Sequence, residues 1–302
     1  MNRPHRAWFD HALRAHLYPA LAVITVAYLC FELSGPPDRI GHRYGLFVGG
    51  MVVVMVLIEM CHPLRTNWRM TNATFWRRDL PFLAIGAATI AGANYLAAIT
   101  ATRYSLERGT SHAELPFAVG LVLAVLTTDF LWYWVHRSSH EARGKVGRFL
   151  WRVHAAHHLP RQVYVLMHAI GHPINAIVVR AILTLPLFFL GFSPAVVFAA
   201  SVVTAFQGLV SHFNVDSRVG WLNYVLVGTE LHRYHHSAKT TEAKNFGAVV
   251  SIWDQLFGTF YYRPGEAPEQ LGIDDPSHYP KDTQIAEIMT YPFLQRRSPP
   301  GS

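Results

Sequence analysis

The sequence predicts an all-α, polytopic membrane protein with four transmembrane helices, a helical hairpin and a histidine-rich helical region that caps the bundle on the cytoplasmic side. Of the 302 residues, 51% are hydrophobic and only 15% are charged, whereas soluble proteins carry roughly 25% charged residues. Four apolar stretches approach the ~20 residues that cross a bilayer. The formal charge of +7 is spread over segments that flank apolar stretches, which fits membrane topology better than nucleic-acid binding.

The four expected spans cover roughly residues 18–34, 44–61, 80–101 and 115–135. The first is expected to remain as an anchor, because no A-x-A cleavage site follows it. Basic residues crowd the segments after the second and fourth spans, and such segments are expected to be cytoplasmic. They are Arg65, Arg69, Arg77, Arg78, Arg137, Arg143, Lys145 and Arg148.

A further apolar block at about 174–211 is divided by the turn signal between Gly191 and Pro194, which predicts a hairpin of two short helices. The pattern leaves open whether this hairpin crosses the bilayer or dips into it and returns. Either way, an even number of passes brings residue 212 back to the side of residue 140. We expect three regions: transmembrane helices at 1–119, a histidine-bearing unit at 120–262, and a frayed tail at 263–302.

Three histidine clusters follow the spacings HxxxH, HxxHH and HxxHH. Positions three and four apart share one face of a helix, so each cluster can aim at least two imidazoles at one point. Neutral imidazole is a ligand for iron, zinc, copper or nickel, and eight such rings exceed the needs of one ordinary site. The clusters therefore predict two metal ions bound by His136, His140, His154, His157, His158, His232, His235 and His236.

Five motifs in this order resemble the fatty acid hydroxylase / sterol desaturase superfamily of integral-membrane di-iron oxygenases. They are DFLWYWVHRSSH (129–140), HAAHH (154–158), HFN (212–214), HRYHHS (232–237) and NFG (245–247) followed by IWDQLFGTFY (252–261). The resemblance covers about residues 120–262. It implies four transmembrane helices under a cytoplasmic cap, with two iron ions that activate O2 to hydroxylate, desaturate or cleave lipids.

The resemblance also implies roles for single residues. His212 is expected as a ninth ligand, with Asn214 as its hydrogen-bond partner; some members carry another histidine four residues earlier, where this chain has Gly208. His172, which forms HxxxH with His168, stays open between lining the site and capping a helix.

Asp129 lies two helical turns before His136 and is expected to accept an imidazole N–H, as carboxylates beside metal ligands commonly do. A hydrogen bond between packed helices is the alternative. His42 and His112 fall in loops that are expected on the opposite face, away from the metals.

Each turnover of such an oxygenase needs two electrons, yet the sequence has no GxGxxG nucleotide motif, no CxxCH haem motif and no iron–sulfur cysteines. We therefore expect a protein electron donor, a cytochrome, ferredoxin or flavin reductase, on the basic cytoplasmic face. The lipid substrate, and hydroxylation as against desaturation, stay open. Two alternatives are a zinc-binding membrane transporter or sensor and a one-zinc hydrolase, although HExxH is absent.

Overall fold

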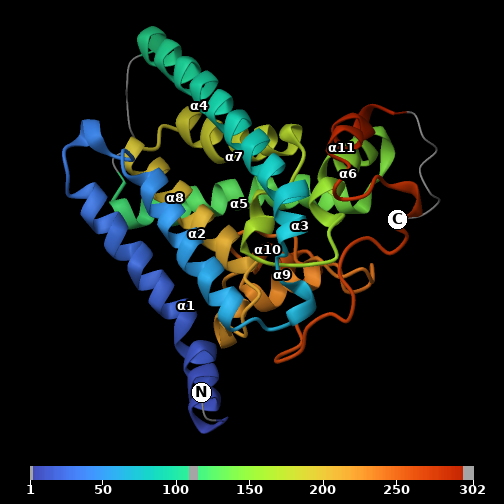
Figure 1. Ribbon diagram of the computed structural model, residues 1–302. Helices are drawn as coiled ribbons and strands as arrows, with labels where there is room; N and C mark the ends of the chain where they lie inside the picture. The colour runs from blue at the N-terminus through green and yellow to red at the C-terminus, as the bar shows by residue number, and fades with distance from the viewer. Residues whose placement is uncertain (1–2, 109–114, 295–302) are drawn as a thin grey trace.

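The computed structural model describes residues 3–108 and 115–294, and this part of the chain is built of helices, with two isolated β-bridges but no strand. The expected all-α fold is therefore confirmed. Figure 1 shows the long helices packed side by side and the shorter ones gathered at one end of them. The α-helices are α1 (Arg3–Leu33), α2 (Tyr44–Cys61), α3 (Asn72–Thr74), α4 (Leu80–Arg108), α5 (Phe117–Glu141), α6 (Gly144–His158), α7 (Pro173–Phe189), α8 (Pro194–Ser211), α9 (Thr229–His235), α10 (Ile252–Leu256) and α11 (Ile285–Thr290).

Short 3-10 helices and one π-helix connect these elements. The π-helix η3 (Phe75–Asp79) leads into α4. The 3-10 helices are η1 (Pro37–Arg39), η2 (Thr66–Trp68), η4 (Val165–Ala169), η5 (Gly220–Tyr224), η6 (Pro276–His278) and η7 (Tyr291–Phe293).

Five helical segments are long and apolar enough to cross a membrane: His11–Leu33, Tyr44–Cys61, Thr66–Thr100, Phe117–Glu141 and Pro194–Ser211. The first four correspond to the expected spans. The fifth is α8, the second arm of the predicted hairpin, whereas the first arm, α7, is one residue shorter at 17 residues. Large apolar side chains such as Leu46, Tyr95 and Val122 are exposed on these helices, as expected for surfaces that face lipid.

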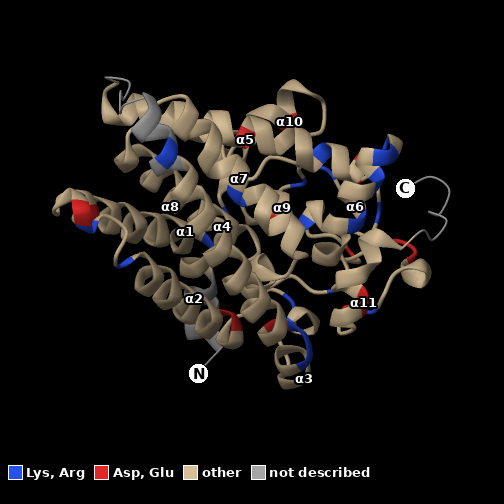
Figure 2. Cartoon of the chain, turned by 90° about the horizontal axis from the view of Figure 1, so that it is seen from above, with Lys and Arg blue, Asp and Glu red and all other residues tan. Residues whose placement is uncertain are grey.

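Charged side chains are scarce along most of the length of α1, α2 and α8 and are more frequent around α3, α6 and α11 (Figure 2). Helix α5 packs against α6, α7 and α8, while α4 packs against α7 and α1 against α8. The helices that line the interior of the bundle therefore continue directly into the histidine-bearing segments.

The expectation of a frayed C-terminal tail is wrong for residues 263–294. The indole of Trp151 donates to the Tyr279 hydroxyl over 2.8 Å, and Arg78 pairs with Asp282. The composition of the tail is rich in proline and polar residues, but these contacts are made by single side chains to distant helices, which composition does not reveal.

Candidate metal centre

Nine buried or partly buried histidines converge where α5, α6, α8 and α9 end. They form two groups, and within each group one donor nitrogen per ring lies within 4.8 Å of all the others. Group one contains His136, His140, His154, His158 and His235, and group two contains His157, His212, His232 and His236. The structure thus brings together the three sequence clusters and His212. His42 belongs to neither group and is exposed between α1 and α2, and His112 lies outside the described residues.

A tight turn between α5 and α6 brings the first two clusters face to face. Ala142 and Gly144 both have positive φ, 48° and 67°. A Cβ atom at Gly147 would lie 3.0 Å from the Ser138 carbonyl oxygen, so the glycine lets α6 pack closely on the end of α5 without displacing that backbone. As a result His154 Nε2 stands 3.0 Å from His136 Nε2.

Helices α6 and α9 each supply both groups. Neighbouring residues on a helix point about 100° apart, so His157 faces group two while His158 faces group one. Helix α9 repeats this division in reverse, since His235 belongs to group one and His236 to group two. The HxxHH spacing therefore lets one helix contribute to both histidine groups.

Backbone carbonyls fix the orientation and the tautomer of four rings. The Nδ1 atoms of these rings lie 2.8 to 3.0 Å from carbonyl oxygens, in the pairs His136–Phe246, His157–Ile170, His212–Gly208 and His235–Lys244. A carbonyl oxygen only accepts hydrogen bonds, so each Nδ1 carries the proton. Each Nε2 then has a free lone pair directed into the centre.

The His157–His212 pair tests whether metal ions fit this arrangement. Their Nε2 atoms are 3.1 Å apart, and both Nδ1 atoms are protonated by the argument above, so two lone pairs face each other with no hydrogen between them. A cation bound by both nitrogens removes this repulsion. Two imidazoles bound to one ion at right angles, with bonds of about 2.1 Å, have nitrogens about 3.0 Å apart.

Three further histidine nitrogens also indicate that metal ions fit this arrangement. The Nε2 atoms of His140 and His235 and the Nδ1 atom of His236 are buried without a hydrogen-bond partner in the described structure. Buried polar atoms are rarely left unpaired. The donor set, made of neutral nitrogens only, therefore fits two imidazole-bound transition-metal ions.

Burial keeps these rings neutral. It lowers the pKa of His157 to about 4 and lowers those of His154, His158 and His236 well below the usual value, with neighbouring imidazoles adding to the effect. A neutral ring is the form that binds metal.

The depressed pKa values predict that acid destabilises the metal-free protein. Below about pH 6.5 the unfolded chain protonates these rings, whereas folded His157 stays neutral down to about pH 4. The free energy of unfolding should therefore fall as pH falls through this window, by about 1.4 kcal/mol per pH unit for each such ring. Thermal unfolding of metal-free protein in detergent, followed by circular dichroism between pH 7 and pH 4, measures this; a constant midpoint would contradict it.

The expected role of Asp129 needs correction. In the described structure its carboxylate contacts no imidazole; it accepts backbone N–H groups from Ala248 and Val249, at 2.9 and 2.8 Å, and from Val250 at 3.3 Å. Helical spacing places Asp129 on the same face as His136. The loop at 248–250, which comes from a distant part of the chain, nevertheless donates its N–H groups to this carboxylate, and no imidazole does.

Asn214 and His172 likewise bind backbone. Asn214 exchanges two side-chain hydrogen bonds with the backbone of Arg65, so it ties the end of α8 to the segment after α2. The Nδ1 atom of His172 accepts the Ile174 N–H and caps α7, and its Nε2 donates to the Met289 carbonyl over 3.2 Å. Capping is therefore the observed role of His172.

A loop at 244–250 supports the histidines of group one, and besides Asp129 it is held by two residues for which the sequence predicts no role. Asp254 accepts the N–H groups of Phe246 and Gly247 at 2.7 and 2.9 Å. Asn245 adopts φ 64° and bonds the Leu231 carbonyl at 3.0 Å. The NFG and IWDQLF motifs were the available signal, and their function is to present the Lys244 and Phe246 carbonyls to His235 and His136.

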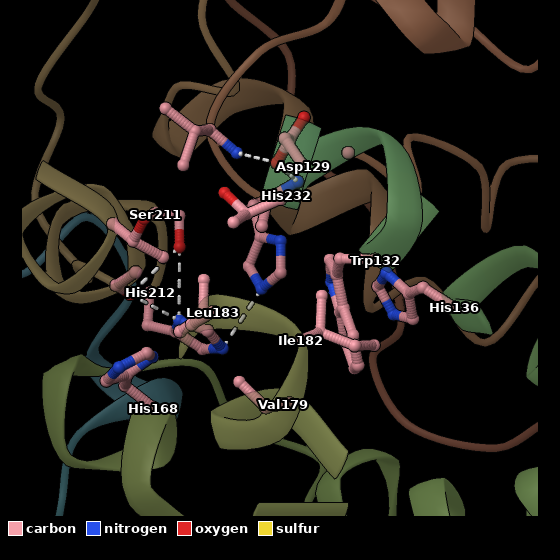
Figure 3. A pocket seen from close by; sticks show the side chains of 16 residues that line it. Asp129, Trp132, His136, His168, Val179, Ile182, Leu183, Ser211, His212 and His232 are labelled. Atoms are coloured by element: carbon pink, nitrogen blue, oxygen red, sulfur yellow. Dashed lines mark hydrogen bonds between the residues drawn. The ribbon is translucent and has the colours of Figure 1, made fainter. Parts of the chain in front are cut away.

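An apolar cavity of about 120 Å³ reaches both histidine groups. Figure 3 shows His136 and Trp132 on one side of it, His212 and His232 on the other, and His168 beside His212. The walls come from α5, α7 and α8 and include Thr128, Val179, Ile182, Leu183, Thr204 and Val249. A hydrocarbon segment in this cavity would lie against both groups at once.

Comparison with known proteins agrees with this architecture. The family model described as fatty acid hydroxylase matches residues 121–259. The chain is 31% identical over 272 residues to ornithine lipid hydroxylase OlsE of Rhizobium tropici, covering 87% of this chain and 80% of that protein. It is 32% identical over 139 residues to human alkylglycerol monooxygenase, covering 45% of this chain and 29% of that protein.

A third relative is fatty acid hydroxylase vlmA of a Lecanicillium species, 30% identical over 158 residues, which is 47% of this chain and 42% of that protein. No solved structure matches. The likeness to the Rhizobium enzyme extends over most of both chains, and the family match coincides with the segment that carries all nine histidines. The chain belongs to the fatty acid hydroxylase family.

Proposed function

We propose that this chain is an integral-membrane, non-haem di-iron oxygenase that hydroxylates or desaturates a membrane lipid with O2 and externally supplied electrons. The observation that carries the proposal is the facing pair of unprotonated nitrogens, His157 Nε2 and His212 Nε2, beside an apolar cavity that touches both histidine groups. We assign the di-iron unit to residues 120–262.

Group one would hold one iron and group two the other. Bound iron supplies the O2 activation and hydrogen abstraction that an unactivated C–H bond requires, because such a bond offers neither an acidic proton nor a leaving group. The protein supplies orientation. Carbonyls of Phe246, Ile170, Gly208 and Lys244 hold the rings, and the apolar walls exclude water and position the chain; a misplacement of about 1 Å in such a site costs on the order of 100-fold in rate.

The relatives narrow the class of substrate. Their printed activities concern ornithine lipid, alkylglycerol and fatty acid, and the one that aligns along most of its length is the ornithine lipid hydroxylase. We therefore favour an aminolipid over a sterol. These relatives also favour the oxygenase over a zinc transporter or sensor, since all of them are lipid hydroxylases or monooxygenases.

A second cleft, lined by charged and aromatic side chains, gives access to group one. It has a volume of about 730 Å³ and reaches His140, His158 and His235. Trp151 lines it and lies 5.2 Å from His140 between ring centroids. We assign this cleft, which we place on the cytoplasmic side, to the approach of the protein electron donor, a cytochrome, ferredoxin or flavin reductase.

Metal removal and replacement test the proposal. Purified protein treated with an iron chelator should lose lipid oxidation, Fe²⁺ should restore it, and Zn²⁺ should occupy the centre without restoring it, because zinc has no redox chemistry. Lipid extracts incubated with the enzyme, a reductase system and O2 are analysed by mass spectrometry for a gain of about 16 or a loss of about 2 mass units. Restoration by Zn²⁺, or product formation without O2, would refute it.

A further inference from the structure

The wall of the apolar cavity contains one imidazole that belongs to neither histidine group. His168 lies in η4 and lines the cavity, with its ring centroid 5.5 Å from that of His212. It is exposed to the cavity, and Figure 3 shows its ring beside His212. Its donor atoms are not part of the set that meets within 4.8 Å in group two.

Gly208 keeps the place of His168 open. A Cβ atom at position 208 would collide with His168 Cε1 and would lie 2.8 Å from Nδ1 and 3.0 Å from Nε2. Gly208 lies in the last turn of α8, three residues before its end at Ser211, and within a helix glycine costs up to about 1 kcal/mol relative to alanine. The presence of glycine at position 208 is therefore explained by the His168 ring, which packs against it.

The turn that carries His168 is tied to the rest of the centre. The buried carboxylate of Glu59 accepts the Val165 N–H over 2.9 Å and the Asn214 N–H over 2.7 Å. The Ile170 carbonyl, two residues after His168, accepts the Nδ1 proton of His157. These bonds fix η4 against group two, so the position of the His168 ring is set by the same contacts that set His157.

Other polar groups in the cavity wall already have partners. The hydroxyls of Thr128, Thr204 and Ser211 donate to carbonyls of their own helix, and Asp129 accepts three N–H groups. In the described structure three groups of the cavity wall form no hydrogen bond: the His168 ring, the indole N–H of Trp132 and the Nδ1 atom of His232, a ring whose Nε2 faces His212 within group two. The indole is stacked on His136 at 4.9 Å, whereas both ring nitrogens of His168 are unpaired.

An unpaired imidazole in an apolar cavity costs free energy unless something binds to it. We propose that His168 is a substrate-binding residue: its ring N–H donates a hydrogen bond to an oxygen atom of the lipid, and so holds a neighbouring carbon beside group two. This inference rests on the proposed function, and it adds that the substrate carries an ether, ester, amide or hydroxyl oxygen close to the carbon that is oxidised.

Binding to zinc-loaded protein tests this without turnover. The probes are 1-O-hexadecylglycerol, which carries oxygen, and eicosane, an alkane of matched length that carries none. An ordinary hydrogen bond corresponds to about a tenfold change in dissociation constant. His168→Ala should weaken binding of the ether about tenfold and leave binding of the alkane unchanged, while His168→Gln, which keeps an N–H donor, should restore part of the loss.

Gly208→Ala provides a second variant that moves the ring without deleting it. It should weaken ether binding as His168→Ala does, and the double variant should show no further loss, because both changes remove the same interaction. His42→Ala is the control. All variants should retain the full metal content.

Three outcomes would overturn the proposal: loss of metal from His168→Ala, which would make His168 a ligand; equal weakening for ether and alkane, which would make it a packing residue; or unchanged binding of both. If the selective loss is observed but no variant or wild-type protein oxidises lipid, then the proposed function fails while the binding role stands.

Discussion

Replacing His157 by alanine is expected to lower product formation by at least about 100-fold, because even the loss of a residue that merely orients a metal ligand lowers metal affinity or activity by 10- to 100-fold. His157 occupies group two only, so bound iron should fall from about two ions per chain toward one. Lipid oxidation and iron content, the latter by mass spectrometry of the metal, measure the two effects on the same preparation.

His42→Ala is the matched control for His157→Ala. It removes an exposed histidine that lies outside both groups, so activity and iron content should match those of the unmodified protein. Equal activity in the two variants would refute the assignment of group two. Loss of all iron from His157→Ala would instead show that the two groups do not fill independently.

Replacing Asp129 by alanine is expected to destabilise the protein by about 3 kcal/mol or more, since one partly buried and two buried residues lose the acceptor of their N–H groups and each unpaired group costs about 1–3 kcal/mol. The loop that Asp129 holds through these N–H groups also presents the Phe246 carbonyl to His136. Iron content should therefore fall together with stability. Denaturation in detergent, followed by near-ultraviolet circular dichroism, gives the change in the free energy of unfolding.

Asp129→Asn separates the acceptor from the charge. Its amide oxygen can still accept from Ala248 and Val249, which both bond the same carboxylate oxygen, while the N–H of Val250 loses its partner. Because one N–H group is left without an acceptor, we expect the free energy of unfolding to fall by about 1–3 kcal/mol. A loss as large as that of the alanine variant would mean that the negative charge, rather than the hydrogen bonds, stabilises the loop.

The sequence predicts the elements whose signal is local. Apolar stretches locate the spans, and the HxxHH spacing predicts which faces of α6 and α9 carry ligands, because both depend on the period of a single helix. The same reasoning fails at the ends of helices. Helix α1 begins at Arg3, well before the apolar stretch, since polar residues continue a helix as readily as apolar ones.

The contacts that support the site depend on segments far apart in the chain, and there the sequence is ambiguous. Asp129 shares a helix face with His136 and Asn214 follows His212 by two residues, yet both bind backbone that lies more than a hundred residues away in the sequence. Asp254 accepts the Phe246 N–H, and the Phe246 carbonyl orients His136, although Asp254 is far from His136 in the sequence. Spacing along a helix shows which side chains share a face, but not which distant backbone will meet them.

Helix α5 runs without a break from Phe117 to His136 and His140 of group one near its end. At the standard helical rise, His136 lies about 28 Å from Phe117, close to the ~30 Å thickness of the hydrocarbon layer. The length of α5 thus places the histidine groups near the boundary between one leaflet and water. Under the proposed function, a lipid in that leaflet would present carbons near its headgroup to this centre without being extracted into water.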